Sequence, residues 1–142
     1  LSGWLTQTNS EVTGPNGFTL PANALGNNGY LEHMLSVMAT SSGGTKTGRV
    51  KAGGSTVANY ASAGSNYQDV ILFTRNQGTP SKQKNSRANG VDAGASGLNA
   101  ASVEATSVDL STSKSMVVTM QNSAIGESFA LLAVACRSTY IG

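Results

Sequence analysis

Few residue types in this sequence are suited to catalysis. The chain of 142 residues holds one cysteine, Cys136, and one histidine, His33, far from it in the sequence. A cysteine nucleophile needs a nearby histidine and an electropositive setting. We therefore expect Cys136 to be a small buried thiol, and His33 to be a hydrogen-bonded or partly exposed strand histidine. Nor do cysteine and histidine recur at metal-ligand spacing, so we expect no metal site.

The acidic residues suggest no active site either. Glycosidases need two converging carboxylates, and the acids here are few and scattered along the chain. They are Glu11, Glu32, Asp69, Asp92, Glu104, Asp109 and Glu127. No serine lies in the Gly-x-Ser-x-Gly motif of a nucleophile elbow. The sequence therefore predicts a protein that is not an enzyme and needs no cofactor.

Residues 43–47 (Gly-Gly-Thr-Lys-Thr) are superficially similar to a phosphate-binding loop. The required spacing of a glycine, four residues and then Gly-Lys-Ser/Thr is missing, and no helical pattern follows. A turn between two strands fits these residues better.

Basic residues are concentrated in the middle of the chain. Between His33 and Val91 the only acid is Asp69, and the basic residues are Lys46, Arg49, Lys51, Arg75, Lys82, Lys84 and Arg87. One interpretation is a basic face for an anionic partner, with Arg75, Lys82, Lys84 and Arg87 as candidate ligand-binding residues. The other, which we favour, is a set of solvated charges that block edge-to-edge strand pairing. Nucleic acid is not an expected partner, because the net charge is only +2 and the aromatic residues are not interleaved with the basic ones.

The composition favours a β-protein. Charged residues make up 11% of the chain, against roughly 25% in typical soluble domains, and hydrophobic residues make up 39%. Ser, Thr, Asn, Gly and Ala fill the difference. No apolar run is long enough to span a membrane, so we expect no membrane insertion, and no signal peptide is visible. The chain begins with Leu1, which leaves open whether it is a processed product or a fragment.

Alternating hydrophobicity predicts several strands. It appears in residues 33–39, 48–52, 55–58 and 115–121, and residues 67–74 are a further strong strand signal. A Ser/Gly turn at residues 41–45 predicts that 33–39 and 48–52 form a hairpin. Residues 78–101 are the least strand-like, and we expect long loops or an extended arm there.

The expected fold is an antiparallel, jelly-roll-like β-sandwich over residues 20–142, preceded by an arm or linker over residues 1–19. The run at 129–136 is apolar on both faces, as in a central strand or one covered by another subunit. Together with Met34/Met38 or Met116/Met120 it offers more apolar surface than one sheet face can bury. We therefore predict a homo-oligomer, most simply a trimer, with Phe129, Leu131 and Ala133 as interface candidates.

The order of several short sequence segments resembles that in the jelly-roll modules of tailed-bacteriophage virion proteins, such as fibre tips, minor tail proteins and capsid decoration proteins. These segments are residues 20–31, 48–57, 73–76, position 83, 107–111 and 116–121. The resemblance spans residues 20–140 and carries no set of functional residues. It implies a β-sandwich, commonly trimeric, that adheres to the host or stabilises the shell without catalysis. No coiled-coil heptads precede residue 20, so a fibre shaft is not expected in this chain.

From this resemblance we expect a structural protein of the virion surface, in contact with other virion proteins. A host-surface glycan is a further candidate partner. The alternative is a lectin-like carbohydrate-binding module, which the same fold also serves. Such a module needs exposed aromatic platforms. The candidates are Trp4, Tyr30, Tyr60, Tyr67 and Tyr140.

Overall fold

The computed structural model shows a sandwich of two antiparallel β-sheets, as the sequence predicts. It describes residues 4–6, 9–15, 17–39, 44–63, 67–89, 105–106 and 108–142. These residues form strands and turns, with no helix among them. The strands are β1 (Trp4–Thr6), β2 (Val12–Thr13), β3 (Phe18–Leu20), β4 (Tyr30–Ala39), β5 (Thr45–Ala52), β6 (Ser55–Ala63), β7 (Tyr67–Asn76), β8 (Gln83–Asn89), β9 (Ala105–Thr106), β10 (Lys114–Asn122) and β11 (Phe129–Thr139).

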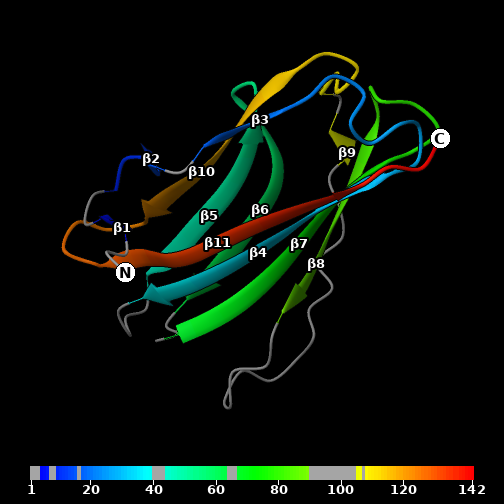
Figure 1. Ribbon diagram of the computed structural model, residues 1–142. Helices are drawn as coiled ribbons and strands as arrows, with labels where there is room; N and C mark the ends of the chain where they lie inside the picture. Colours follow the sequence, from blue (N-terminus) through cyan, green and yellow to red (C-terminus); the bar gives the residue numbers. More distant parts are fainter. Residues whose placement is uncertain are drawn as a thin grey trace.

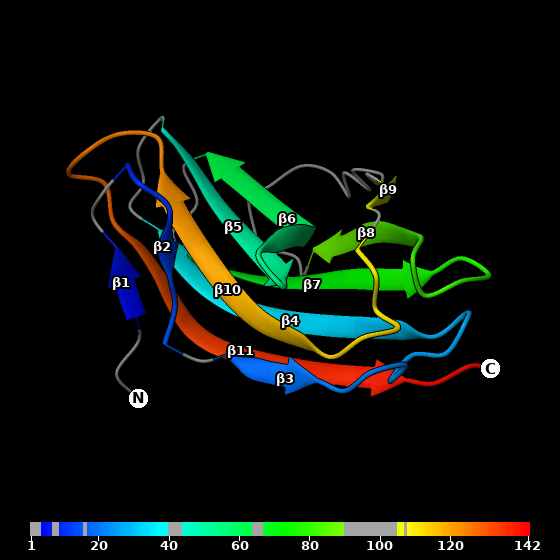
Figure 2. The same ribbon diagram turned by 90° about the horizontal axis from the view of Figure 1, so that it is seen from above.

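The two sheets lie face to face (Figures 1 and 2). The six-stranded sheet has the order β1-β11-β4-β7-β8-β9. The five-stranded sheet has the order β2-β10-β5-β6, with β3 also paired to β10. Two strand pairs that are nested in the sequence, β4 with β11 and β5 with β10, lie in opposite sheets. This nesting gives the sandwich its jelly-roll-like character.

The hairpin predicted between residues 33–39 and 48–52 is wrong. β4 pairs with β7 and β11, whereas β5 pairs with β6 and β10, so the chain crosses from one sheet to the other between β4 and β5. The turn of the hairpin that does form is Gly53-Gly54, between β5 and β6. Both glycines have positive φ (55° and 86°), the left-handed conformation that a two-residue hairpin turn requires. Of the predicted turn at residues 41–45, residues 41–43 lie outside the described residues, and Thr45 begins β5.

Period-two alternation places one side of each long strand in the core. On β5 every second residue from Lys46 to Ala52 is buried. On β10 the stripe of Met116, Val118 and Met120 faces inward, so the two methionines belong to the core and not to an exposed surface. Burial of apolar area between the sheets is the main stabilising contribution of such a fold.

Two segments are more ordered than the sequence suggests. Gln83–Asn89, within the stretch expected to be loop, is β8 and pairs with β7 along its whole length. The mostly polar residues of β8 hide this from a search for hydrophobic alternation. The expected arm at residues 1–19 contributes β1, β2 and part of β3, which pair with β11 and β10. Residues 90–101 lie outside the described residues.

Buried amide side chains tie together the loops at one end of the sandwich. This is the end where the 21–29 turn and the C-terminus meet in Figures 1 and 2. The side-chain amide of Asn76 donates to the carbonyl of Gly26 (2.7 Å) and accepts from Nε2 of Gln83 (3.1 Å). Gln83 in turn donates to the carbonyl of Pro80 (2.5 Å) and accepts from the backbone N–H of Val108 (3.1 Å). Segments far apart in the sequence are thus joined by two buried side chains.

We predict that Asn76→Ala destabilises the protein by about 2–3 kcal/mol, because the carbonyl of Gly26 and Nε2 of Gln83 each lose a buried partner. Urea unfolding followed by circular dichroism measures the loss. Asn59→Ala, at an exposed position of β6, is the matched control and should change stability by less than about 0.5 kcal/mol. Equal losses in the two variants would contradict a stabilising role for the network.

Candidate functional site

The outer face of the six-stranded sheet is unusually apolar. Met34 and Met38 on β4 and Tyr67 on β7 are 50%, 48% and 47% exposed. They point outward because the alternate residues of β4, His33, Leu35 and Val37, fill the core. Register joins them into one surface, since directly opposed residues share a face and Met38 lies opposite Tyr67. We call Met34, Met38, Tyr67, Ala133 and Ala135 the apolar face.

Strand β11 borders this face and has an open edge. β1 pairs only with Phe129–Leu131, and from Ala133 to Thr139 the described residues offer β11 no partner other than β4. The register shifts by one residue between Leu131 and Ala133, a β-bulge. After this bulge Ala135 lies opposite Met34 and therefore belongs to the outer face.

The three predicted interface residues lie in different environments. Phe129 and Leu131 are 1% and 6% exposed and belong to the core, where another subunit cannot reach them. Ala133 is exposed. β11 is apolar on both sides because one side packs inside the sandwich and the other forms part of the apolar face. The sequence alone did not show which of its residues lie on which side. Of the two methionine pairs considered, Met34/Met38 is exposed.

Polar groups on the same face are paired with one another. The Ser36 hydroxyl donates to Oδ1 of Asp69 (2.5 Å), and the Tyr67 hydroxyl donates to the same oxygen (3.0 Å). The guanidinium of Arg137 contacts Glu32 at 2.5 Å. These pairs reduce the cost of covering the face with another apolar surface, because each polar group keeps a partner there.

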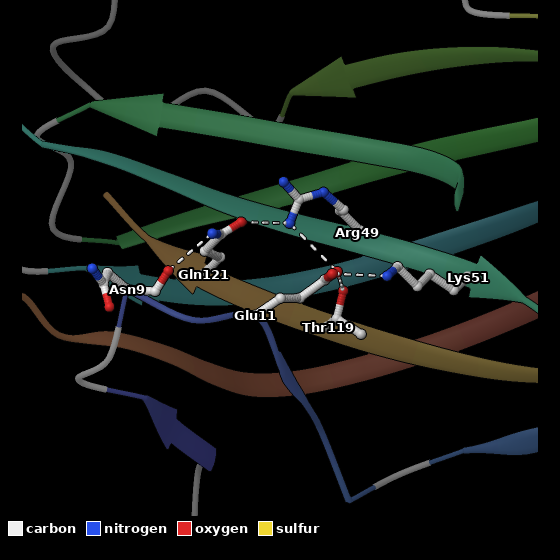
Figure 3. A network of polar contacts seen from close by, with 6 residues as sticks. All are labelled: Asn9, Glu11, Arg49, Lys51, Thr119 and Gln121. Atoms are coloured by element: carbon white, nitrogen blue, oxygen red, sulfur yellow. Dashed lines mark hydrogen bonds and ion pairs between the residues drawn. The ribbon is translucent and has the colours of Figure 1, made fainter. Parts of the chain in front are cut away.

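The outer face of the five-stranded sheet is polar instead. Figure 3 shows Glu11 between Lys51 and Arg49 of β5, at 2.8 and 3.4 Å. The carboxylate oxygen that contacts Arg49 also accepts a hydrogen bond from the hydroxyl of Thr119 on β10. Arg49 also donates to Gln121 (3.1 Å), whose amide donates to the carbonyl of Asn9 (2.9 Å).

This network sets the charge state of Glu11. Burial alone raises the pKa of its carboxyl, but hydrogen bonds from Lys51 and Thr119 and the charges of Lys51 and Arg49 hold that pKa below its usual range. Glu11 therefore stays ionised near neutral pH and fixes the segment before β2 onto the sheet. Arg49 and Lys51 are occupied by this contact, and Lys46 is fully buried against Glu127 (3.4 Å).

The candidate anion-binding residues lie at the far edge of the six-stranded sheet. Arg75 on β7 and Lys84 on β8 are exposed and directly opposite each other, and Lys82 precedes β8 in an exposed turn. No acid of the described residues forms an ion pair with these three. The side chain of Arg87 lies outside the described residues. The structure thus brings Arg75 and Lys84 together, on the same side of the sheet.

His33 and Cys136 meet although they are far apart in the sequence. They are opposite each other on β4 and β11, with Nδ1 of His33 3.5 Å from Sγ of Cys136. The expectations for both were wrong in part. Cys136 is exposed rather than buried, and His33 is 2% exposed with no partner for Nε2 among the described residues.

Both groups are uncharged near neutral pH. Burial lowers the pKa of His33 to about 4. Burial of the sulfur, followed by the charge of Glu32, raises the pKa of the Cys136 thiol to about 11. A protonated thiol is a poor nucleophile, so this contact lacks the electropositive setting of a reactive cysteine.

Comparison with protein-family models, with curated proteins and with solved structures finds no match for this chain. Within the described residues, no three His, Cys, Asp or Glu side chains are grouped so that they could hold a metal ion. No helix there is long and apolar enough to cross a membrane.

We predict that acid weakens the fold through His33. Its pKa is about 6.5 in the unfolded chain and about 4 in the folded protein, so the unfolded state binds the additional proton. The free energy of unfolding should therefore be fully retained above pH 6.5 and fall by roughly 3 kcal/mol as the pH drops to 4. Urea unfolding at a series of pH values measures this loss.

The variant His33→Phe is the control for this titration, because it keeps a ring of similar shape and removes the titrating group. The carboxylates titrate in both proteins, so the difference between the two pH profiles isolates His33. Parallel profiles between pH 7 and 4 would show that burial of His33 does not govern the acid response.

Proposed function

We propose that this chain is a non-catalytic structural module that assembles with copies of itself on the surface of a tailed-bacteriophage particle. The apolar face carries the proposal. A sandwich sheet that faces water usually alternates apolar residues inward with polar residues outward. The five-stranded sheet follows that pattern, whereas the six-stranded sheet places two half-exposed methionines and a half-exposed tyrosine on its outer side.

A second copy of the chain is the occupant that fits this face best. Single exposed apolar residues are ordinary, but several that gather on one face of a sheet are typical of an interaction site. The side chains of Ala133 and Ala135, near Met34, are small, so the backbone of a neighbouring copy can approach this part of the face closely. The ion pair of Glu32 with Arg137 at its border stays satisfied when the face is covered. Homo-oligomers with closed symmetry are the commonest assemblies of soluble proteins. We propose a trimer, which is the state that the resemblance to phage modules implies.

The placement on a virion rests on the resemblance to phage modules. Four of the segments that carry it contribute to the buried network at one end of the sandwich, through Gly26, Asn76, Gln83 and Val108. Buried residues with that role stabilise the fold, which is compatible with the structural role that the resemblance implies.

The lectin alternative finds less support. Tyr67 begins β7 and Tyr140 follows β11, and because both strands run antiparallel to β4 these two exposed rings lie at opposite ends of the sheet. Tyr60 is buried, and Tyr30 packs edge-on against Phe73 with ring centroids 6.2 Å apart. The side chain of Trp4 lies outside the described residues. The described tyrosines thus form no shared platform for a sugar.

We predict that the purified chain sediments as a trimer at micromolar concentration and that Met34→Glu combined with Met38→Glu converts it to a monomer. Charges placed on a covered apolar face lose hydration without a partner. The control is Asn59→Glu, an exposed position on the outer side of the five-stranded sheet, which should leave the trimer intact. A wild-type protein that remains monomeric at these concentrations would contradict self-assembly.

The position of the chain in a particle tests the virion part separately. Intact phage particles labelled with an antibody raised against this chain should show the label on the shell or at the tail tip by electron microscopy. Unlabelled particles, in a preparation whose disrupted proteins do react with the antibody, would contradict exposure on the virion surface.

A further inference from the structure

Arg75 on β7 and Lys84 on β8 are two exposed basic residues on the outer side of the six-stranded sheet. The three basic residues of β5 are each held by an acid, Glu11 or Glu127. Arg75 and Lys84 instead lie directly opposite each other and form no ion pair with an acid of the described residues. Like charges directly opposite on neighbouring strands repel each other and destabilise a sheet. The fold alone therefore gives no reason for both charges at these positions.

Protection of a sheet edge does not explain the two charges. Charged residues on edge strands block pairing with another chain. β7, however, lies between β4 and β8 (Figure 1). β8 is in turn covered at Lys84 by β9, where Ala105 is its partner. Arg75 and Lys84 thus have a paired strand on each side, and the interpretation of edge protection, which we favoured from the sequence, does not apply to them.

The neighbours of the pair leave its charge uncompensated. Tyr30 of β4 lies directly opposite Arg75 on the other side and is half-buried. The next outward-facing residue of β4 is Glu32, the nearest acid by strand register, and Arg137 binds it at 2.5 Å. Arg75 is therefore flanked by a lysine on one side and by an aromatic ring on the other, while the carboxylate next along β4 is held by a different arginine.

Lys82 extends the positive charge to the turn before β8. It is exposed, and its carbonyl accepts a hydrogen bond from the backbone N–H of Gln77 (2.9 Å), so the pairing of the two strands continues to this position. Residues two apart in an extended chain point to the same side, so Lys82 shares the outer side with Lys84. We call Arg75, Lys82 and Lys84 the basic patch.

We propose that the basic patch binds a phosphate group, with Arg75 and Lys84 as its direct contacts. An arginine donates two parallel hydrogen bonds to an oxyanion, and a lysine binds phosphate as a point charge. Directly opposite strand residues have Cα atoms about 4.5–5.5 Å apart, so the two side chains can reach different oxygens of one phosphate. A phosphomonoester carries about −1.5 to −2 charges at neutral pH, which balances the two opposed positive charges. Binding therefore replaces their repulsion with two attractive contacts.

Titration of the full chain with inorganic phosphate, at an ionic strength held constant with sodium chloride, tests this binding. NMR follows the Nε–H signal of Arg75 and the backbone amide of Lys84, and we expect saturable shifts of both at millimolar phosphate. Arg75→Gln and Lys84→Gln should each weaken binding by about two- to fivefold, as is usual for exposed charge pairs. Lys114→Gln removes the same charge from β10 in the other sheet and should leave the affinity unchanged.

Glucose 6-phosphate and glucose distinguish two sources of the phosphate. Tighter binding of glucose 6-phosphate than of inorganic phosphate, with no binding of glucose, identifies a phosphorylated sugar as the ligand class. Equal affinities for the two phosphates identify the free anion. Shifts that fail to saturate at constant ionic strength, or an equal loss of affinity in Lys114→Gln, would overturn the proposal.

Unfolding measures the repulsion within the patch independently. In phosphate-free buffer of low ionic strength, Lys84→Gln should raise the midpoint of urea unfolding, because it removes a like charge opposite Arg75. Added phosphate should raise the melting temperature of the wild-type protein but not that of Arg75→Gln combined with Lys84→Gln. A lower urea midpoint in Lys84→Gln would show that this charge serves the fold rather than a ligand.

Discussion

The structure depends on the packing of inward-facing apolar side chains from β4 against those from β5. These two strands are adjacent in the sequence but belong to opposite sheets. β4 supplies Leu31, Leu35 and Val37 from one side, and β5 supplies Val50 and Ala52 from the other. β4 and β5 do not pair with each other, and each has one sheet partner far along the chain, β11 for β4 and β10 for β5. The crossing places the nested pairs β4–β11 and β5–β10 in opposite sheets, on the two sides of the core.

The two outer faces differ because their exposed residues differ in chemistry, although the same alternation created both. On β5 the outward positions Arg49 and Lys51 bind Glu11 and hold the segment before β2 on the sheet. On β4 two of the outward positions are Met34 and Met38, which have no polar group to satisfy and gain by being covered. One face is thus complete within a single chain, and the other is suited to a neighbour.

Buried polar side chains appear in two different states inside the sandwich. Asn76 and Gln83 satisfy both their donors and their acceptors within one network, so they fix the loops at one end. His33 has one nitrogen in contact with Cys136 and the other without a partner among the described residues. A fully bonded network stabilises the fold, whereas a buried nitrogen without a partner lowers its stability.

The sequence by itself determined the secondary structure class, the inward stripes of β5 and β10 and the excess of apolar surface, because alternation and composition are local properties. It did not reveal β8, whose polar residues are held in the sheet by backbone hydrogen bonds to β7. It predicted a hairpin from β4 to β5, since a turn signal does not say which sheet the next strand joins. It also placed Phe129 at an interface and treated His33 and Cys136 as unrelated. Strand pairing over long sequence distances decided these points, and only the tertiary structure specifies that pairing.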